Sequence, residues 1–285
     1  MHLYVDTRPF GSSVPRGAHR LIQAITSRLP GNWLGMRTAI LLRRRAMARL
    51  GEAGVDVTHF NLRLRLYPVG NTCEKAALYT PQLFHPVERM VLARLAREAV
   101  ARKSLFTFID LGANVGLFSL MAAQLAGGRA RVLAIEPQPD IRERLAFNVE
   151  NHPGFDIRPL GIALADREGE VDLFIDQRDR GGSRIGGRGQ GESVKVRGRK
   201  LEAVLIEEGF EGADVMKVDV SGSEELVLWS FVETAAAALL PRVLMMKDSS
   251  AMWTRDVFAL LRARGYSEGE RSRSHVFFYL ERKSV

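Results

Sequence analysis

The pattern of hydrophobic positions changes period along the chain. Near the N-terminus, apolar residues recur at helical spacing over residues 17–29 and 33–50. Over residues 57–68, polar and apolar residues alternate, which predicts a half-buried strand, with 76–79 as its expected partner strand. A further helix is predicted over 86–102, where proline opens an amphipathic segment.

From residue 104 onward, predicted strands and helices alternate. Short apolar runs bounded by turn residues are typical of buried strands, and the longer segments between them are typical of helices. Strands are expected at 106–111, 131–135, 155–162, 171–175, 193–196, 214–219, 242–247 and 275–281, and helices at 116–126, 139–151, 199–208, 222–239 and 252–264. This order predicts an α/β fold in which helices cover both faces of a mostly parallel sheet. The final strand has no long crossover before it and is expected to pair antiparallel with its neighbour.

The same pattern predicts three regions. Residues 1–55 form a basic amphipathic N-terminal arm, and residues 56–103 form a β-hairpin and a helix that lead into the core. Residues 104–285 form the α/β domain, which contains a loop rich in Gly and Arg at 176–191. That loop is expected to be a mobile surface loop or a substrate-capping lid, and its arginines (178, 180, 184 and 188) are candidates to meet an anionic or sugar substrate.

The net charge of +8 is concentrated at the N-terminus. Residues 1–50 carry nine Arg, no Lys and one acid, Asp6, so they account for 9 − 1 = +8 and the rest of the chain is balanced. The predicted basic helix either packs on the domain with its Arg face in water or lies on an anionic membrane surface. Because the body is neutral, nucleic acid is not an expected partner.

Cysteine content and hydropathy bear on location. Cys73 is the single cysteine, so a disulfide framework and a Cys-rich metal site are excluded, and no residue is assigned to a metal. No apolar stretch reaches the roughly eighteen residues that a membrane-spanning helix needs. We therefore expect a cytoplasmic protein, with a peripheral position at the inner face of the membrane as an extension through its Arg-rich arm.

The most informative stretch is residues 106–124, FTFIDLGANVGLFSLMAAQ. Glycines at a strand-to-helix turn let the backbone approach a ligand, and the helix N-terminus offers free N–H groups, so this loop predicts a nucleotide-type cofactor site. A dinucleotide fingerprint beginning at Gly112 would require glycine where Asn114 and Leu117 stand, which argues against NAD. The loop instead reads Asp110-x-Gly112-x-Asn114-x-Gly116.

An acid follows at the end of the next predicted strand. Glu136 lies 136 − 112 = 24 positions after the first glycine of the loop, and a carboxylate there has two oxygens for the two hydroxyls of a ribose.

These motifs together resemble the class I S-adenosylmethionine methyltransferases and, within them, the FkbM family. The resemblance rests on FIDLGANVGLFSL and AIEPQPDIRERLAFNVEN, with LYTPQLFHPVER before them and GIALADREGEV and VMKVDVSGSEELVL after them, and it covers roughly residues 60–281. It implies a Rossmann-like, doubly wound, seven-stranded sheet with an antiparallel last strand. It also implies S-adenosylmethionine as cofactor and methyl transfer to a hydroxyl of a sugar, a glycan or a small-molecule secondary metabolite. Carried over, the methionine part is held by Asp110, Gly112, Asn114 and Gly116, the ribose by Glu136, and the adenine by Ile162 and Ala163.

The sequence departs from the family pattern on the acceptor side. The family usually has D-x-E-G-x-E after the fourth strand, but Ser221 replaces the first Glu here, and Lys247 replaces a Glu that often closes the fifth strand. Ser221 with Glu224 predicts a capping box for helix 222–239. Asp219 is the candidate to orient or deprotonate the acceptor. Lys217 is a candidate either to lower the acceptor's pKa or to pair with that acid, and Lys247 is a candidate for the same role.

Two alternatives remain open at this stage. An RNA ribose methyltransferase would use a similar lysine–aspartate set, with phosphate contacts from the Arg arm and the Gly/Arg loop. A catalytically decayed methyltransferase fold would bind cofactor or partner without turnover, as the two replaced acids suggest. The sequence identifies neither the acceptor nor the oligomeric state.

Overall fold

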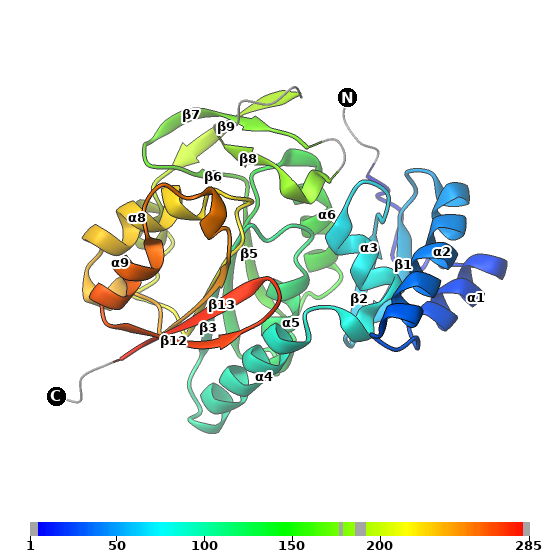
Figure 1. The fold of residues 1–285 in the computed structure, drawn as a ribbon, viewed down its shortest axis with the longest axis horizontal. Helices are drawn as coiled ribbons and strands as arrows, with labels where there is room; N and C mark the ends of the chain where they lie inside the picture. The colour runs from blue at the N-terminus through cyan, green and yellow to red at the C-terminus, as the bar shows by residue number, and fades with distance from the viewer. Residues whose placement is uncertain (1–4, 177–178, 186–191, 282–285) are drawn as a thin grey trace.

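The computed structural model describes residues 5–176, 179–185 and 192–281, and its centre is a seven-stranded sheet (Figure 1). The strand order is β12-β13-β11-β10-β3-β4-β5. The bounds are β3 (Phe106–Leu111), β4 (Ala130–Ile135), β5 (Asp156–Leu160), β10 (Val215–Val218), β11 (Val243–Lys247), β12 (Tyr266–Arg271) and β13 (His275–Leu280). Five neighbouring strands, β11, β10, β3, β4 and β5, are parallel. Strand β13 is antiparallel to both of its neighbours, β11 and β12. The prediction of a doubly wound α/β fold with an antiparallel last strand is confirmed.

Helices cover both faces of this sheet. One face carries α4 (Pro86–Ala101), α5 (Leu117–Leu125) and α6 (Pro139–Glu150), and the other carries α7 (Leu201–Glu207), α8 (Glu224–Thr234) and α9 (Val257–Ala263). Successive residues of a strand point to opposite faces. Accordingly, Phe108 of β3 belongs to the core under α4 and α5, whereas Ile109 belongs to the core under α8 and α9.

The region before the sheet differs from the prediction in two places. The expected strand 57–68 is a hairpin of β1 (Val55–His59) and β2 (Leu62–Leu66), joined at Phe60-Asn61, where both residues have positive φ as a two-residue primed turn requires. The expected strand 76–79 was wrong, because these residues lie in helix α3 (Thr72–Tyr79). The Asn71 side chain caps that helix by accepting from the backbone N–H of Glu74.

A small second sheet lies over the carboxyl ends of the parallel strands (Figure 1). Its order is β6-β9-β7-β8. The strands are β6 (Ala163–Leu164), β7 (Gly169–Phe174), β8 (Arg184–Ile185) and β9 (Ser193–Arg199), and the short 3-10 helix η2 (Arg180–Gly182) precedes β8. This sheet places residues 179–185 above the end of the main sheet where ligands bind in open α/β folds.

The N-terminal helices, α1 (Gly17–Thr26) and α2 (Trp33–Leu50), pack on the side of the domain. Arg65 of β2 ties the preceding segment down, since its buried guanidinium pairs with Asp56 at 2.6 Å and donates to the carbonyl oxygens of Asp6, Arg8 and Pro9. In the described part of the chain, no helix combines the length and apolar character needed to cross a membrane.

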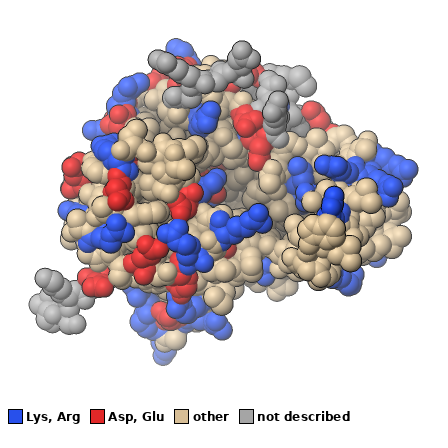
Figure 2. Space-filling model, in the orientation of Figure 1, with Lys and Arg blue, Asp and Glu red and all other residues tan. Residues whose placement is uncertain are grey.

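Helix α2 buries one side and exposes the other. Ala39 and Ala46 are buried. The outward side, which we call the basic apolar face, consists of Trp33, Leu34, Arg37, Leu41, Arg44 and Arg45. Trp33 is 69% exposed, unusually high for tryptophan, and basic side chains gather at this end of the molecule (Figure 2).

Candidate functional site

The loop between β3 and α5 has the backbone geometry of a ligand cradle. Gly112, Asn114 and Gly116 all have positive φ. A Cβ on Gly112 would lie 2.0 Å from the carbonyl oxygen of Asp219, so only glycine lets this loop pack against the end of β10. Gly116 caps α5, and a Cβ there would lie 2.5 Å from the end of the Leu145 side chain of α6.

Asp110 and Lys217 form a buried ion pair behind the loop. Lys217 Nζ donates to Asp110 Oδ1 at 2.9 Å and to the carbonyl oxygen of Gly112 at 3.0 Å, and Ser119 Oγ donates to Asp110 Oδ2 at 2.7 Å. Burial disfavours the ammonium, but the charges of Asp110 and Asp219 outweigh it, and the pKa of Lys217 is raised. The structure therefore places Lys217 where it supports the loop. It also places Asp110 one layer behind the cavity that the loop borders.

Glu136 lies where β4 ends, on the floor of that cavity. Its Oε2 accepts from the backbone N–H of Asn114 at 2.9 Å, and its Oε1 accepts from that of Gln138 at 3.0 Å. Each carboxylate oxygen retains a second lone pair for a ligand hydroxyl. Burial raises the pKa of Glu136 to about 7, although the two amides and Lys217 favour the charged form.

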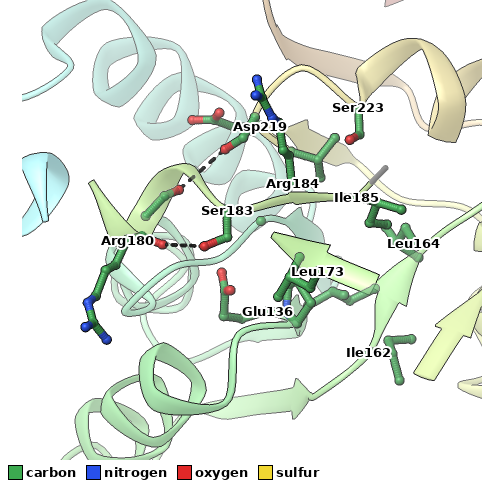
Figure 3. A pocket seen from close by; sticks show the side chains of 16 residues that line it. Glu136, Ile162, Leu164, Leu173, Arg180, Ser183, Arg184, Ile185, Asp219 and Ser223 are labelled. Carbon is green, nitrogen blue, oxygen red and sulfur yellow. Dashed lines mark hydrogen bonds between the residues drawn. The ribbon is translucent and has the colours of Figure 1, made fainter. Parts of the chain in front are cut away.

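The cavity beside Glu136 has the chemistry of an adenosine site. The side chains around it are apolar on the side away from the loop: Ile162, Leu164, Leu173 and Ile185. Ala163, the second residue expected beside adenine, instead packs in the small cluster with Ala165 and Val171. Residues of the 179–185 segment run across the opening (Figure 3).

That segment also closes the cavity. Arg180 N–H donates to the carbonyl oxygen of Gly70 at 2.8 Å, and Ser183 Oγ donates to Gln138 Oε1 at 2.7 Å. The volume of this cavity is about 40 Å³, below the several hundred Å³ of ordinary ligand pockets. The donor and acceptor pattern fits S-adenosylmethionine, and residues 180–185 narrow the space that an adenosine would occupy. Of the four loop arginines, Arg178 and Arg188 lie outside the described residues, and Arg180 and Arg184 line this cavity.

A second cavity of about 260 Å³ adjoins the first and shares Gly112, Gly181 and Asp219 with it. Asp219 stands between the two, and Lys247 Nζ lies 2.8 Å from its Oδ1. Burial disfavours ionisation of Asp219, but Lys217, Lys247 and His275 outweigh it and lower its pKa to about 2. Asp219 raises the pKa of Lys247 in return, against the effect of burial. The predicted catalytic residues Asp219 and Lys247 thus face this second cavity as an ion pair.

Ser221 does not form the predicted capping box, and helix α8 begins at Glu224 rather than at 222. Ser221 has φ +55, and its Oγ donates to the carbonyl oxygen of Gly181 at 3.5 Å. The Glu224 side chain instead accepts from the backbone N–H groups of Val220 and Gly222. The positive φ turns the Ser221 side chain away from the helix and toward the 179–185 segment.

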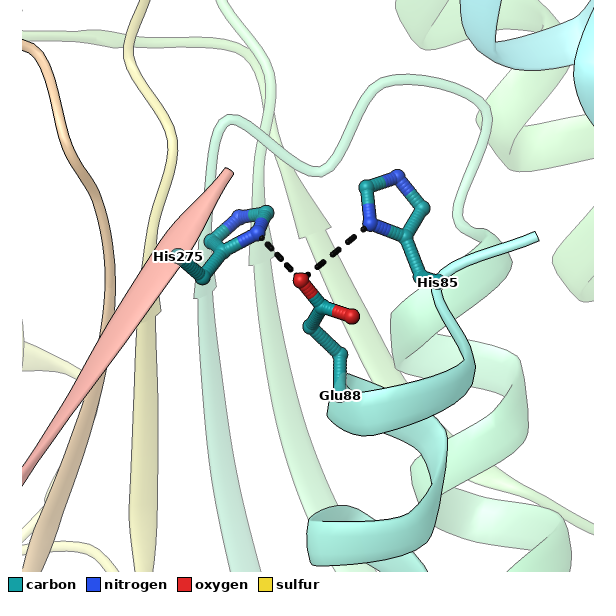
Figure 4. A group of neighbouring side chains, drawn as sticks. All are labelled: His85, Glu88 and His275. Atoms are coloured by element: carbon teal, nitrogen blue, oxygen red, sulfur yellow. Dashed lines mark hydrogen bonds and ion pairs between the residues drawn. The ribbon is translucent and has the colours of Figure 1, made fainter. Parts of the chain in front are cut away.

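Three residues near the second cavity carry chemistry that the sequence did not reveal: His85, Glu88 and His275. Glu88 Oε1 lies 2.8 Å from His275 Nδ1 and 3.5 Å from His85 Nδ1, and the two rings flank the carboxylate (Figure 4). Both imidazoles line the cavity. The sequence offered one signal for this group, His85 and Glu88 at the start of helix α4. His275 is distant in sequence and meets Glu88 only through the fold.

Comparisons with known proteins identify the family of this chain. The Methyltransferase FkbM domain family matches residues 110–267, which is more than half of the chain. The AMB antimetabolite synthetase AmbE of Pseudomonas aeruginosa is 31% identical over a match that covers 49% of this chain and 8% of AmbE. The chain therefore spans a small fraction of that relative.

Solved structures give low-similarity matches. The methyltransferase domain of METTL16 matches at a TM-score of 0.43 with 15% identity, covering 68% of this chain and 67% of that one. Precorrin-6y C5,15-methyltransferase from Geobacter metallireducens matches at 0.40 with 11% identity, covering 68% of this chain and 86% of that one. The assignment rests on the family match and on the sheet described above: the chain belongs to the FkbM methyltransferase family.

Proposed function

We propose that the protein is an S-adenosylmethionine-dependent O-methyltransferase that acts on a hydroxyl of a sugar, a glycan or a small-molecule metabolite. The observation that carries this proposal is the junction of two cavities at Gly112, Gly181 and Asp219. One cavity has a buried acid suited to a ribose, and the other has carboxylate, ammonium and imidazole groups suited to a polar acceptor.

Each side of the junction has a separate task. When bound, S-adenosylmethionine supplies an electrophilic methyl group. Glu136 would accept from the ribose hydroxyls, and the buried Asp110–Lys217 pair holds the loop that contacts the cofactor. The Asp219–Lys247 pair would orient the acceptor. Fixing two reactants in line and excluding water supply much of the rate enhancement of such transfers.

Binding and transfer are tested separately. Calorimetry should show that S-adenosylmethionine binds the full chain and that Glu136→Gln weakens the binding at least about tenfold, since a hydrogen bond to a charged group contributes roughly 1.5–3 kcal/mol. Glu143→Gln is the matched control, because it makes the same chemical change at an exposed residue of α6, the helix that follows Glu136. Failure of the wild-type protein to bind would remove the proposal.

Transfer is assayed by supplying methyl-labelled S-adenosylmethionine and the protein to a lysate of cells that lack it. We expect label in the sugar, glycan or small-molecule fraction, in a form that survives mild alkali, because methyl ethers resist alkali and methyl esters do not. Label in ribose of RNA would favour an RNA methyltransferase. Binding with no labelled product in any fraction would favour a catalytically decayed fold.

A further inference from the structure

His275 is a buried imidazole with one unsatisfied nitrogen at the wall of the second cavity. It opens β13 directly opposite Lys247 of β11, and its side chain is only 1% exposed. Among the described residues, its Nε2 has no hydrogen-bond partner. A buried polar atom left without a partner requires an explanation, and a ligand group that supplies the partner is one.

Glu88 determines which nitrogen of His275 carries the proton. Its Oε1 lies 2.8 Å from His275 Nδ1 and also accepts from Ser272 Oγ at 2.5 Å. Burial disfavours ionisation of Glu88, but hydrogen bonds from His275, His85 and Ser272 outweigh it and hold its pKa well below the usual range. An ionised carboxylate accepts hydrogen bonds, so Nδ1 carries the proton and Nε2 presents its lone pair.

The surroundings of Nε2 suit a group that gains a proton during a reaction. Asp219 Oδ2 lies 4.0 Å from Nε2, so an imidazolium at His275 would stand between two carboxylates. The charged and titratable groups around it are Glu88 of α4, His85 just before that helix, Asp219 after β10, Lys217 of β10 and Lys247 of β11. Cys73 and Asp179 also line the cavity. Imidazole is the side chain that ordinarily exchanges protons closest to neutral pH. Asp219, with its pKa near 2, is too weak a base for that task at neutral pH.

We propose that His275 Nε2 is the general base that takes the proton of the acceptor hydroxyl and that Glu88 is the residue that positions it. The proposal rests on the O-methyltransferase function proposed above. In the step, the O–H bond breaks and its proton goes to Nε2. The oxygen forms its bond to the methyl carbon as the carbon–sulfur bond breaks, and the electron pair of that bond stays on the sulfur, which leaves as a neutral thioether. The imidazolium then releases its proton to solvent.

The test compares full-length variants in the labelled-methyl lysate assay across pH. His275→Asn keeps an N–H near the Nδ1 position for Glu88 but removes Nε2. We expect it to lower the transfer rate about 10²–10⁴-fold while S-adenosylmethionine affinity stays unchanged. The acidic limb of the wild-type rate profile should disappear in this variant. His152→Asn is the control, because His152 is bonded to Asn148 and Arg63 outside either cavity.

Glu88→Gln tests the positioning role of Glu88 through the pH–rate profile, which would not shift if Glu88 served only to stabilise the fold. Removing a carboxylate that stabilises the imidazolium should move the acidic limb to lower pH and slow transfer. A His275→Asn variant with wild-type rate and profile would overturn the proposal. So would activity that is lost on chelation and restored by Zn²⁺, because His85, Glu88 and His275 would then be metal ligands.

A measurement on the wild-type protein keeps the proposal testable without any acceptor or variant. Nitrogen-15 NMR of labelled histidines should show His275 as the Nδ1–H tautomer when neutral. An Nε2–H tautomer would refute the proposal whether or not transfer is observed. Absence of any transfer by the wild-type protein, with the expected tautomer present, would instead count against the proposed function.

Discussion

The raised pKa of Glu136 predicts that nucleoside affinity depends on pH. Ribose hydroxyls donate hydrogen bonds, and a carboxylate accepts them more strongly when it is ionised. With a pKa of about 7, Glu136 is about 90% ionised at pH 8 and about 3% ionised at pH 5.5. If only the ionised form accepts both hydroxyls, Kd should rise about thirtyfold as the pH falls from 8 to 5.5, which corresponds to about 2 kcal/mol of binding free energy.

Adenosine is the probe, because it carries the ribose diol but no group that titrates near neutral pH. Calorimetry at pH 5.5, 7 and 8, in two buffers with different ionisation enthalpies, should show weaker binding and more proton release at the lower pH values. Glu136→Gln should bind weakly and equally at all three, and Glu143→Gln should follow the wild type. A wild-type Kd that is constant across the interval, or an unchanged pH slope in Glu136→Gln, would refute the assignment of Glu136 to the ribose.

The folding stability of the ligand-free protein should depend on pH in the opposite direction to the affinity for adenosine. The pKa of Glu136 is raised above its ordinary value of 4.5, so its contribution to folding is complete below that pH and is lost as the pH rises through about 7. Glu136→Gln should therefore stabilise the free protein at pH 8, by at most about 3 kcal/mol, while it weakens binding. Urea denaturation at pH 5 and pH 8 measures the difference.

Three other outcomes follow from the described contacts. Gly112→Ala should destabilise the protein to urea by several kcal/mol more than Gly128→Ala. Both residues have φ near +77, but a Cβ on Gly112 would clash with the Asp219 carbonyl oxygen at 2.0 Å, whereas one on Gly128 would lie in ordinary contact with the Gly154 carbonyl oxygen at 3.6 Å. Lys217→Met should cost roughly 3–5 kcal/mol by leaving Asp110 buried without its cation, and adding Asp110→Asn should recover most of it in the same denaturation assay. The full chain should bind phosphatidylserine vesicles at low salt and not phosphatidylcholine vesicles, and serine at the three apolar positions of the basic apolar face should abolish the binding in flotation assays.

The sequence predicted the parts of the fold whose signal is local. The parallel strands β3, β4, β10 and β11 are buried on both faces, so an apolar run marks each of them directly. Strand β12 was missed because Tyr266–Arg271 is an edge strand with mostly polar, exposed positions. The β1–β2 turn was missed because Phe60-Asn61 contains neither Gly nor Pro. Helix α3 had a usable signal, since Asn71 with Glu74 marks a helix start.

The cofactor side of the site was predicted better than the acceptor side, again because its residues are close together in the sequence. The residues expected to hold the methionine part and the ribose lie within one strand–loop–helix–strand unit from Asp110 to Glu136, so their spacing along the chain constrains their spacing in space. The second cavity, proposed for the acceptor, is lined by residues from α3, α5, the 179–185 segment, β10, β11 and β13, and Glu88 of α4 contacts His275. Glu88 and His275 are 187 residues apart, and no local pattern connects them. Sequence reasoning therefore identified the acids that are replaced on this side, but not the groups that stand near them.

Lys247 and His275 both bear on which group can take the acceptor proton. A glutamate at 247 would stand beside Asp219, and two neighbouring carboxylates raise one pKa, which makes a better base. Lysine does the reverse, because its ammonium lies 2.8 Å from Asp219 Oδ1 and contributes to lowering the pKa of Asp219 to about 2. The same pair leaves an anionic oxygen 4.0 Å from His275 Nε2, where it would stabilise a proton gained by that ring. Replacing the acid thus weakens Asp219 as a base, and under the proposal above His275 Nε2 takes the acceptor proton in its place.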